Sequence, residues 1–239
     1  KDLENLQNAL SSTESFIEKN HKALSIALGV IIVIIAAWLL IQNLYIVPKN
    51  DEADNLLAKG QTYFAAENYD VALNGDSIEF GGFLDLCDNY SITKSGKLAY
   101  AYAGLSYYKL GDYDNAIKYL EDYSGKDEVL KYTVLGTIGD CYIQKGDTEK
   151  AIKYFMDAAK SDNILVKPVY MVKAGVAYES LGNYDKAIEL YNEVKSDATS
   201  AQRGIPEVDD IDKYVNPETI AMHKQAVQKA AEEKVFEKQ

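Results

Sequence analysis

A motif with fixed internal spacing recurs along most of this chain and limits the folds open to it. A glycine is followed three positions later by Tyr and nine positions after that by Ala. The last three copies begin 35 and 36 residues apart, whereas 44 residues separate the first copy from the second. The copies comprise Gly60, Tyr63 and Ala72; Gly104, Tyr107 and Ala116; Gly139, Tyr142 and Ala151; and Gly175, Tyr178 and Ala187. A period of about 35 residues is typical of small helical or strand units that stack.

Each copy has the composition of two helices joined by a tight turn. Gly111, Gly146 and Gly182 stand between apolar stretches, and glycine adopts the left-handed conformation that ends a helix. The residues expected to cap the second helices are Asp112, Asp114, Asp147, Asn183 and Asp185. The small motif residues let paired helices approach closely, and the tyrosines fill the space beside them. Because one hairpin cannot bury its apolar faces alone, we predict an all-α solenoid of about four helix pairs over residues 48–197.

Residues 23–47 are a separate feature, an apolar run without a charged side chain. Roughly 20 residues at 1.5 Å each cross the hydrocarbon core of a bilayer, so we predict a transmembrane helix over this run, ended by Pro48. A cleavable signal peptide is the alternative, but no small-x-small cleavage site follows the run. Lys19 and Lys22 precede the run, which favours a cytoplasmic position for residues 1–22.

Two regions break the repeat period. The longer first interval places an insertion near residues 74–96, where Phe80 and Phe83 suggest an extra helical turn or two. Such an insertion either binds a partner or packs locally on the solenoid, and we favour local packing. Residues 198–239 predict a turn, a short helix and a final helix that begins at Pro217. A solenoid needs a polar terminal cap, and we expect these last helices to supply it.

Charge and motif content narrow the classes of function. The chain has a net charge of −12, which falls on residues 51–239 and disfavours binding to nucleic acid or anionic lipid. The sequence has no P-loop, G-x-S-x-G or H-E-x-x-H motif, and its two histidines are about two hundred residues apart. We therefore expect no enzyme, no metal site and no cofactor. A disulfide between Cys87 and Cys141 stays open, although free buried thiols are common in helices.

The repeat resembles the tetratricopeptide repeat, a helix–turn–helix unit of 34 residues with Gly, Tyr, Ala, Phe and a late Ala at set places. The third copy carries the most matches: Gly139, Tyr142, Gly146, Ala151, Phe155 and Ala158. The resemblance covers about residues 53–197. It is imperfect, since Leu135, Met171 and Tyr100 stand where the pattern prefers Trp and no copy has the terminal Pro.

The resemblance implies a concave groove lined by the first helix of each pair. Transferred to this sequence, the family's register places these residues at the groove: Leu57, Gln61, Phe64, Leu98, Ala101, Leu105, Tyr108, Thr133, Gly136, Asp140, Ile143, Val169, Val172, Val176 and Glu179. Such a wall is apolar and aromatic with acidic spots, and it suits an extended or helical apolar segment of a protein partner. The alternative is that a helix of this chain fills the groove permanently, the final helix being the candidate.

An N-terminal membrane helix followed by an acidic repeat domain is similar to the YfgM-type ancillary proteins of the SecYEG translocon, and more narrowly to membrane-anchored repeat proteins of Bacteroidetes. This resemblance implies a periplasmic interaction module on a bacterial inner membrane. Its expected partners are translocon subunits, a membrane-anchored prolyl isomerase chaperone or nascent secreted chains. The alternative is a docking receptor or scaffold that faces the cytoplasm.

Overall fold

The computed structural model describes residues 2–76, 78–197 and 204–236. Within these ranges all regular structure is helical and no strand occurs, which confirms the predicted all-α class. The chain divides into two compact units, Lys1–Glu52 and Ala53–Gln239.

The first unit contains α1 (Asp2–Ile41), the π-helical turn η1 (Gln42–Ile46) and the start of α2 (Val47–Ala65). The prediction that Pro48 ends the helix is wrong, because helical structure continues beyond it. Proline has no N–H, and its ring crowds the carbonyl four residues earlier, here that of Leu44. The π-helical turn η1 is wider than an α-helical turn and leaves room for the proline ring. In it the Val47 N–H donates to the Gln42 carbonyl five residues back.

One helical stretch of the described residues, Lys19–Ala65, is long and apolar enough to cross a membrane. Its most apolar window has a mean hydropathy of 3.0 and buries no residue against the protein. Large apolar side chains such as Ile26 and Trp38 are accordingly exposed. A signal sequence near the N-terminus meets the same criteria of length and composition.

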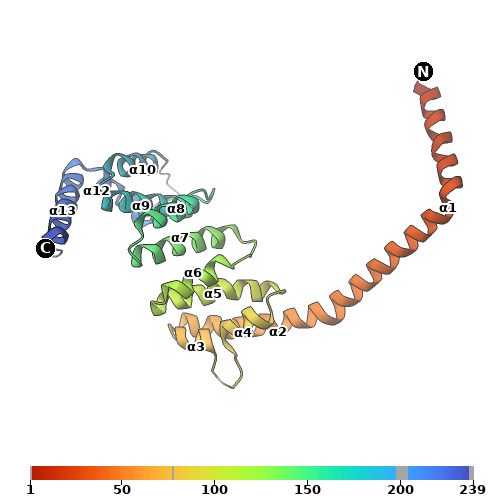
Figure 1. The fold of residues 1–239 in the computed structure, drawn as a ribbon, viewed down its shortest axis with the longest axis horizontal. Helices are drawn as coiled ribbons and strands as arrows, with labels where there is room; N and C mark the ends of the chain where they lie inside the picture. Colours follow the sequence, from red (N-terminus) through yellow and green to blue (C-terminus); the bar gives the residue numbers. More distant parts are fainter. Residues whose placement is uncertain (1, 77, 198–203, 237–239) are drawn as a thin grey trace. The chain divides into compact units, whose positions relative to one another are not determined.

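The second unit is a row of helix pairs (Figure 1). In chain order the pairs are α2 with α3 (Tyr69–Asn74) and α4 (Gly82–Asn89), α5 (Lys94–Leu110) with α6 (Tyr113–Glu121), α7 (Glu128–Gln144) with α8 (Thr148–Ala158), and α9 (Val166–Ser180) with α10 (Tyr184–Asp197). The short helices α11 (Pro206–Asp209) and α12 (Ile211–Val215) follow, and then α13 (Pro217–Phe236). Three clusters of buried side chains lie between successive pairs, so the row has the shared core that stacked hairpins require.

The motif glycines mark the closest approach of the two helices in each of the last three pairs. A Cβ added to Gly104 would lie 2.5 Å from Leu120, one on Gly139 would lie 2.6 Å from Phe155, and one on Gly175 would lie 2.3 Å from Tyr191. The partner side chain stands sixteen residues after the glycine each time. The expected close packing of small residues is therefore confirmed.

The turns also follow the prediction in these pairs. Gly111, Gly146 and Gly182 have φ between 75° and 81°, and the first pair places Glu67 in the same left-handed region, with φ 58°. The caps are confirmed where Asp112, Asp147 and Asn183 accept the N–H three residues ahead. The other two expected caps are wrong: Asp114 and Asp185 lie in the first turn of their helices instead.

The insertion interrupts the second helix of the first pair. This helix stops at α3 and resumes at α4, which places Phe83 beside Gly60, at 2.4 Å from an added Cβ. Phe83 thus fills the space that Leu120, Phe155 and Tyr191 fill in the other pairs. Phe80 and Phe83 are at most 2% exposed, which supports local packing of the insertion.

The C-terminal elements cover the last pair. Val208 of α11 and Ile211 of α12 are buried in the same cluster as α9 and α10, and the ring centroid of Tyr214 lies 5.1 Å from that of Tyr191. The final helix begins at Pro217 as predicted, and Asn216 accepts the Glu218 N–H at its start. Residues 198–203 and 237–239 of the predicted cap lie outside the described residues.

Candidate interaction groove

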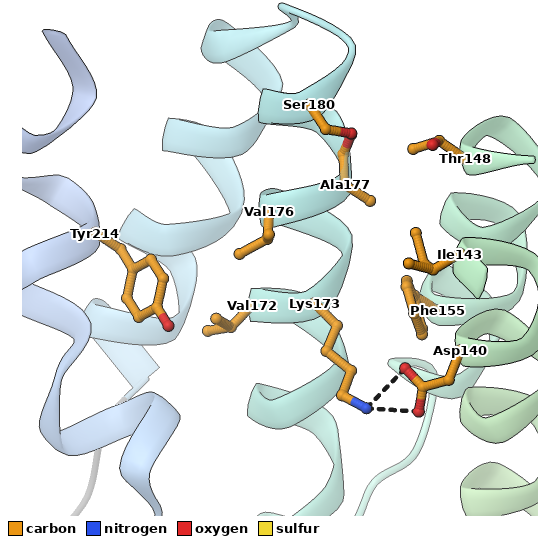
Figure 2. A pocket seen from close by; sticks show the side chains of 10 residues that line it. All are labelled: Asp140, Ile143, Thr148, Phe155, Val172, Lys173, Val176, Ala177, Ser180 and Tyr214. Carbon is orange, nitrogen blue, oxygen red and sulfur yellow. Dashed lines mark hydrogen bonds and ion pairs between the residues drawn. The ribbon is translucent and has the colours of Figure 1, made fainter. Parts of the chain in front are cut away.

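A cavity of about 470 Å³ opens between α7 and α9, the first helices of two successive pairs (Figure 2). We call it the groove cavity. Its lining comes from α7, α8, α9 and α12: Asp140, Ile143, Thr148, Phe155, Val172, Lys173, Val176, Ala177, Ser180 and Tyr214. No described residue of α13 belongs to this lining. The final helix therefore does not fill this part of the groove.

Aliphatic side chains give the groove cavity its apolar character. Ile143 of α7 and Val176 of α9 are 38% and 45% exposed, although most apolar side chains of these helices are buried or half-buried. Figure 2 shows Ile143 pointing from α7 toward α9, whereas Val176 and Val172 extend from α9 toward the side of Tyr214. Covering such side chains with an apolar ligand group removes their surface from water and favours binding.

One ion pair supplies the charge at the edge of the groove cavity. The Nζ of Lys173 lies 2.7 and 2.9 Å from the two carboxylate oxygens of Asp140. The same Nζ lies 5.8 Å from the ring centroid of Phe155 and 5.6 Å from that of Tyr170, within the range of a cation–π interaction. Because the two charges cancel, the groove cavity presents an apolar centre with little net charge.

Titratable groups beneath the groove stay protonated at neutral pH. Burial raises the pKa of Tyr170 to about 12 and that of the Cys141 thiol to about 12.

Cys87 and Cys141 are both free and buried, so the structure has no disulfide between them. Among the described residues, no group of three or more His, Cys, Asp or Glu side chains could hold a metal ion.

The structure brings four of the residues assigned to the groove by the repeat register into one cavity: Asp140, Ile143, Val172 and Val176. Other members of that set are closed off by neighbours. Leu57 is buried in the core of the first pairs, and Tyr170 occupies the space beside Gly136. In the first pair, Gln61 donates a hydrogen bond to the Tyr102 hydroxyl at 3.1 Å.

The remaining members of the set pack against aromatic and aliphatic neighbours. Phe64 makes an edge contact with Tyr102, and Leu98, Leu105 and Tyr108 are half-buried against the core around α5, α6 and α7. Thr133 and Val169 are half-buried, and Ala101 is fully buried. The open part of the predicted groove is therefore the α7–α9 segment, whereas the first pair is closed by side chains of its own helices and of α5.

Glu179 joins the solenoid to the final helix. Its carboxylate is buried, and its Oε2 lies 2.7 Å from the Nδ1 of His223 on α13. Burial and the neighbouring Glu179 carboxylate raise the pKa of Tyr191 well above its usual range. Glu179 therefore holds α13 in place and does not line the groove cavity.

The register did not supply six of the lining residues: Thr148, Phe155, Lys173, Ala177, Ser180 and Tyr214. Lys173 follows the groove position Val172 on α9 and stands 33 residues after Asp140. Two opposite charges about one repeat apart are the sequence feature from which this ion pair could be predicted. Tyr214 lies beyond the last repeat, on a short helix that follows a linker. Periodicity carries no information about where such a helix folds back.

Comparison with known families agrees with this architecture. Two models described as tetratricopeptide repeat match residues 98–126, 132–164 and 169–196, the regions of the α5–α6, α7–α8 and α9–α10 pairs. The first pair, whose second helix is interrupted, lies outside these matches. Comparison with curated proteins finds no match. Residues 98–196 thus contain three tetratricopeptide repeats, and the groove cavity lies between the second and the third.

Proposed function

We propose that this chain is a membrane-tethered interaction module that binds apolar segments of unfolded secreted polypeptides in the groove cavity. Tetratricopeptide repeats imply a protein–protein interaction module. The observation that carries the proposal is the exposure of Ile143 and Val176 in a hollow whose described lining has two charged side chains, Asp140 and Lys173, which neutralise each other. Such a surface favours an apolar occupant.

The tether is the second part of the proposal. An apolar helix long enough to cross a membrane precedes the repeats in the chain. Tethering raises the effective concentration of the repeats near chains that emerge at the membrane, so weak contacts with many sequences suffice. We place the module on the periplasmic side of a bacterial inner membrane, ancillary to the Sec translocon or to envelope protein folding. Lys19 and Lys22 before the apolar run support this orientation.

Binding of an unfolded polypeptide tests the groove. The probe is a fluorescently labelled secreted protein kept unfolded by reduction and carboxymethylation, and the full chain in detergent micelles is titrated against it. We expect the double variant Ile143→Asp and Val176→Asp to weaken binding by about tenfold or more, because an apolar segment would bury two unpaired carboxylates.

The matched control places the same two substitutions on equally exposed aliphatic residues outside the cavity, Leu110→Asp and Val129→Asp. These side chains are 48% and 46% exposed. Binding by the control should stay within about twofold of the unaltered chain, and the far-ultraviolet circular dichroism of both variants should be unchanged. Equal binding by the groove variant and the unaltered chain would show that the polypeptide does not bind in the groove cavity.

Protease access in spheroplasts tests the side of the membrane. A periplasmic repeat domain is digested when protease is added to intact spheroplasts. A cytoplasm-facing receptor stays protected until the membrane is lysed, and protection would replace the periplasmic proposal with that alternative.

A further inference from the structure

A second cavity, of about 410 Å³, lies where α5 begins and where the loop from α6 reaches α7. We call it the lysine cavity. Lys94 and Lys97 of α5 and Lys126 of the loop gather around it, together with Leu98 and Tyr123. The register analysis placed Leu98 at the groove but gave no indication of the three lysines.

The three lysines of this cavity have no acidic partner among the described residues, as is also true of lysines elsewhere such as Lys109 and Lys153, but these three gather around one hollow. Acidic residues outnumber basic ones by 37 to 25, and in the described part of the second unit nine other lysines form ion pairs with Asp or Glu. Lys94, Lys97 and Lys126 form no ion pair with any described residue. Three free ammonium groups around one hollow are therefore available to a ligand.

The acidic residue at the lysine cavity is already engaged. Asp127 caps α7, and its Oδ1 accepts the Leu130 N–H at 2.7 Å. Burial raises the pKa of Tyr123, so its phenol is neutral at physiological pH. The cavity thus combines three unpaired cations with an aliphatic and an aromatic side chain, which suits a carboxylate that stands next to an apolar group.

We propose that the lysine cavity binds Asp or Glu side chains of the protein segment whose apolar residues occupy the groove. This inference rests on the proposed function and adds a requirement on the partner: an acidic residue near an apolar one. Charge complementarity supports a short acidic segment as the occupant. A long polyanion such as nucleic acid would be repelled by the net charge of −12.

Two fluorescently labelled peptides test the proposal on the full chain in detergent micelles. One alternates Leu with Glu, and the other carries Gln in place of every Glu. We expect the Glu peptide to bind about tenfold more tightly, because charge-assisted hydrogen bonds are stronger than neutral ones. The double variant Lys97→Glu and Lys126→Glu should remove this preference.

The matched control reverses two other lysines that form no ion pair with a described residue and lie outside the lysine cavity, Lys109→Glu and Lys153→Glu. It makes the same change in net charge, so it should keep most of the preference for the Glu peptide. The proposal is overturned if the unaltered chain shows no preference for Glu over Gln, or if the control loses the preference as fully as the cavity variant does. Either failure leaves the proposed function standing, provided that the unfolded polypeptide still binds and the groove substitutions still weaken it.

Discussion

The close approach of the two helices in each repeat depends on a single glycine and on the side chain that lies against it. Leu120, Phe155 and Tyr191 occupy the space that a larger residue would need. Each of these residues is at most 2% exposed: Leu120 is 1% exposed, Phe155 2% and Tyr191 0%. They have no room to move aside. The glycine therefore recurs in the sequence at each position where the two helices of a pair come closest.

Substitution of one such glycine tests this view. Gly139→Val places its side chain against the Phe155 ring, 2.6 Å from the nearest ring carbons at the Cβ. Overpacking of this kind costs about 1–3 kcal/mol. We expect the free energy of unfolding in urea to fall by about that amount, as followed by circular dichroism of the full chain.

The control Lys153→Val puts the same residue at an exposed position on α8. Surface substitutions away from special features usually change stability by less than about 0.5 kcal/mol. Equal stability of the two variants would show that the glycine is not required for the close packing of α7 and α8.

The second helix of the first repeat shows how an element can be interrupted without loss of its packing. Asp76 organises the loop between α3 and α4: its Oδ1 accepts the N–H groups of Ile78, Glu79 and Phe80 at 2.9–3.0 Å, and its Oδ2 accepts the Tyr63 hydroxyl at 3.0 Å. The Asp76 N–H donates to the Phe80 carbonyl at 2.9 Å. One carboxylate thus orders the loop and ties it to Tyr63 of α2.

Acidification tests the role of Asp76. The backbone hydrogen bonds from Glu79, Ile78 and Phe80 hold the pKa of this carboxyl well below its usual range. Because the folded-state pKa is depressed, its stabilisation is present above the unfolded value of about 3.9 and is lost as the pH falls below it toward the folded value. We expect hydrogen exchange at the amides of Ile78, Glu79 and Phe80, corrected for the intrinsic pH dependence, to lose protection in that range.

The variant Asp76→Ala should lose the same protection already at neutral pH, whereas Asp88→Ala, an exposed acid at the end of α4, should keep it. Unchanged protection of these three amides in Asp76→Ala would mean that other contacts hold the loop.

Much of the fold at the level of elements could be predicted because its causes are local. A glycine that ends a helix and an Asp or Asn that caps the next one act within a few residues, so α5 to α10 follow from spacing. The packing of the first pair is harder to predict because of the insertion. The side chain that packs against Gly60 is Phe83, 23 positions later, whereas the spacing is sixteen in the other pairs. The continuation of the helix beyond Pro48 is not predictable from the sequence pattern, because a π-helical turn accommodates the proline within a helical run.

The candidate site was predictable only where it follows the repeat. Ile143 and Val176 occupy positions that the register exposes, and both line the groove cavity. Leu57 and Phe64 hold related positions in the first pair, yet neighbouring aromatic and apolar side chains cover them. The place of Tyr214 depends on how the chain folds back after the last repeat, and the free lysines of the lysine cavity depend on which acidic residues find other partners.

At the scale of the whole molecule, an apolar N-terminal helix precedes a row of helix pairs, and two of the hollows in that row differ in chemistry. The groove cavity offers aliphatic side chains and a neutralised ion pair, whereas the lysine cavity offers unpaired cations. The two hollows involve the first helices of the three matched repeats. A partner with apolar and acidic side chains at suitable spacing would engage both.

Photocrosslinking in living cells tests the central claim that emerging secreted polypeptides occupy the groove cavity. A photoreactive amino acid replaces Val176 in one strain and Lys153, an exposed residue of α8 outside the groove cavity, in another. The account predicts adducts between position 176 and secreted chains that disappear when secretion is blocked, with few adducts from position 153. Equal labelling from both positions, or adducts at 176 that persist when secretion is blocked, would contradict it.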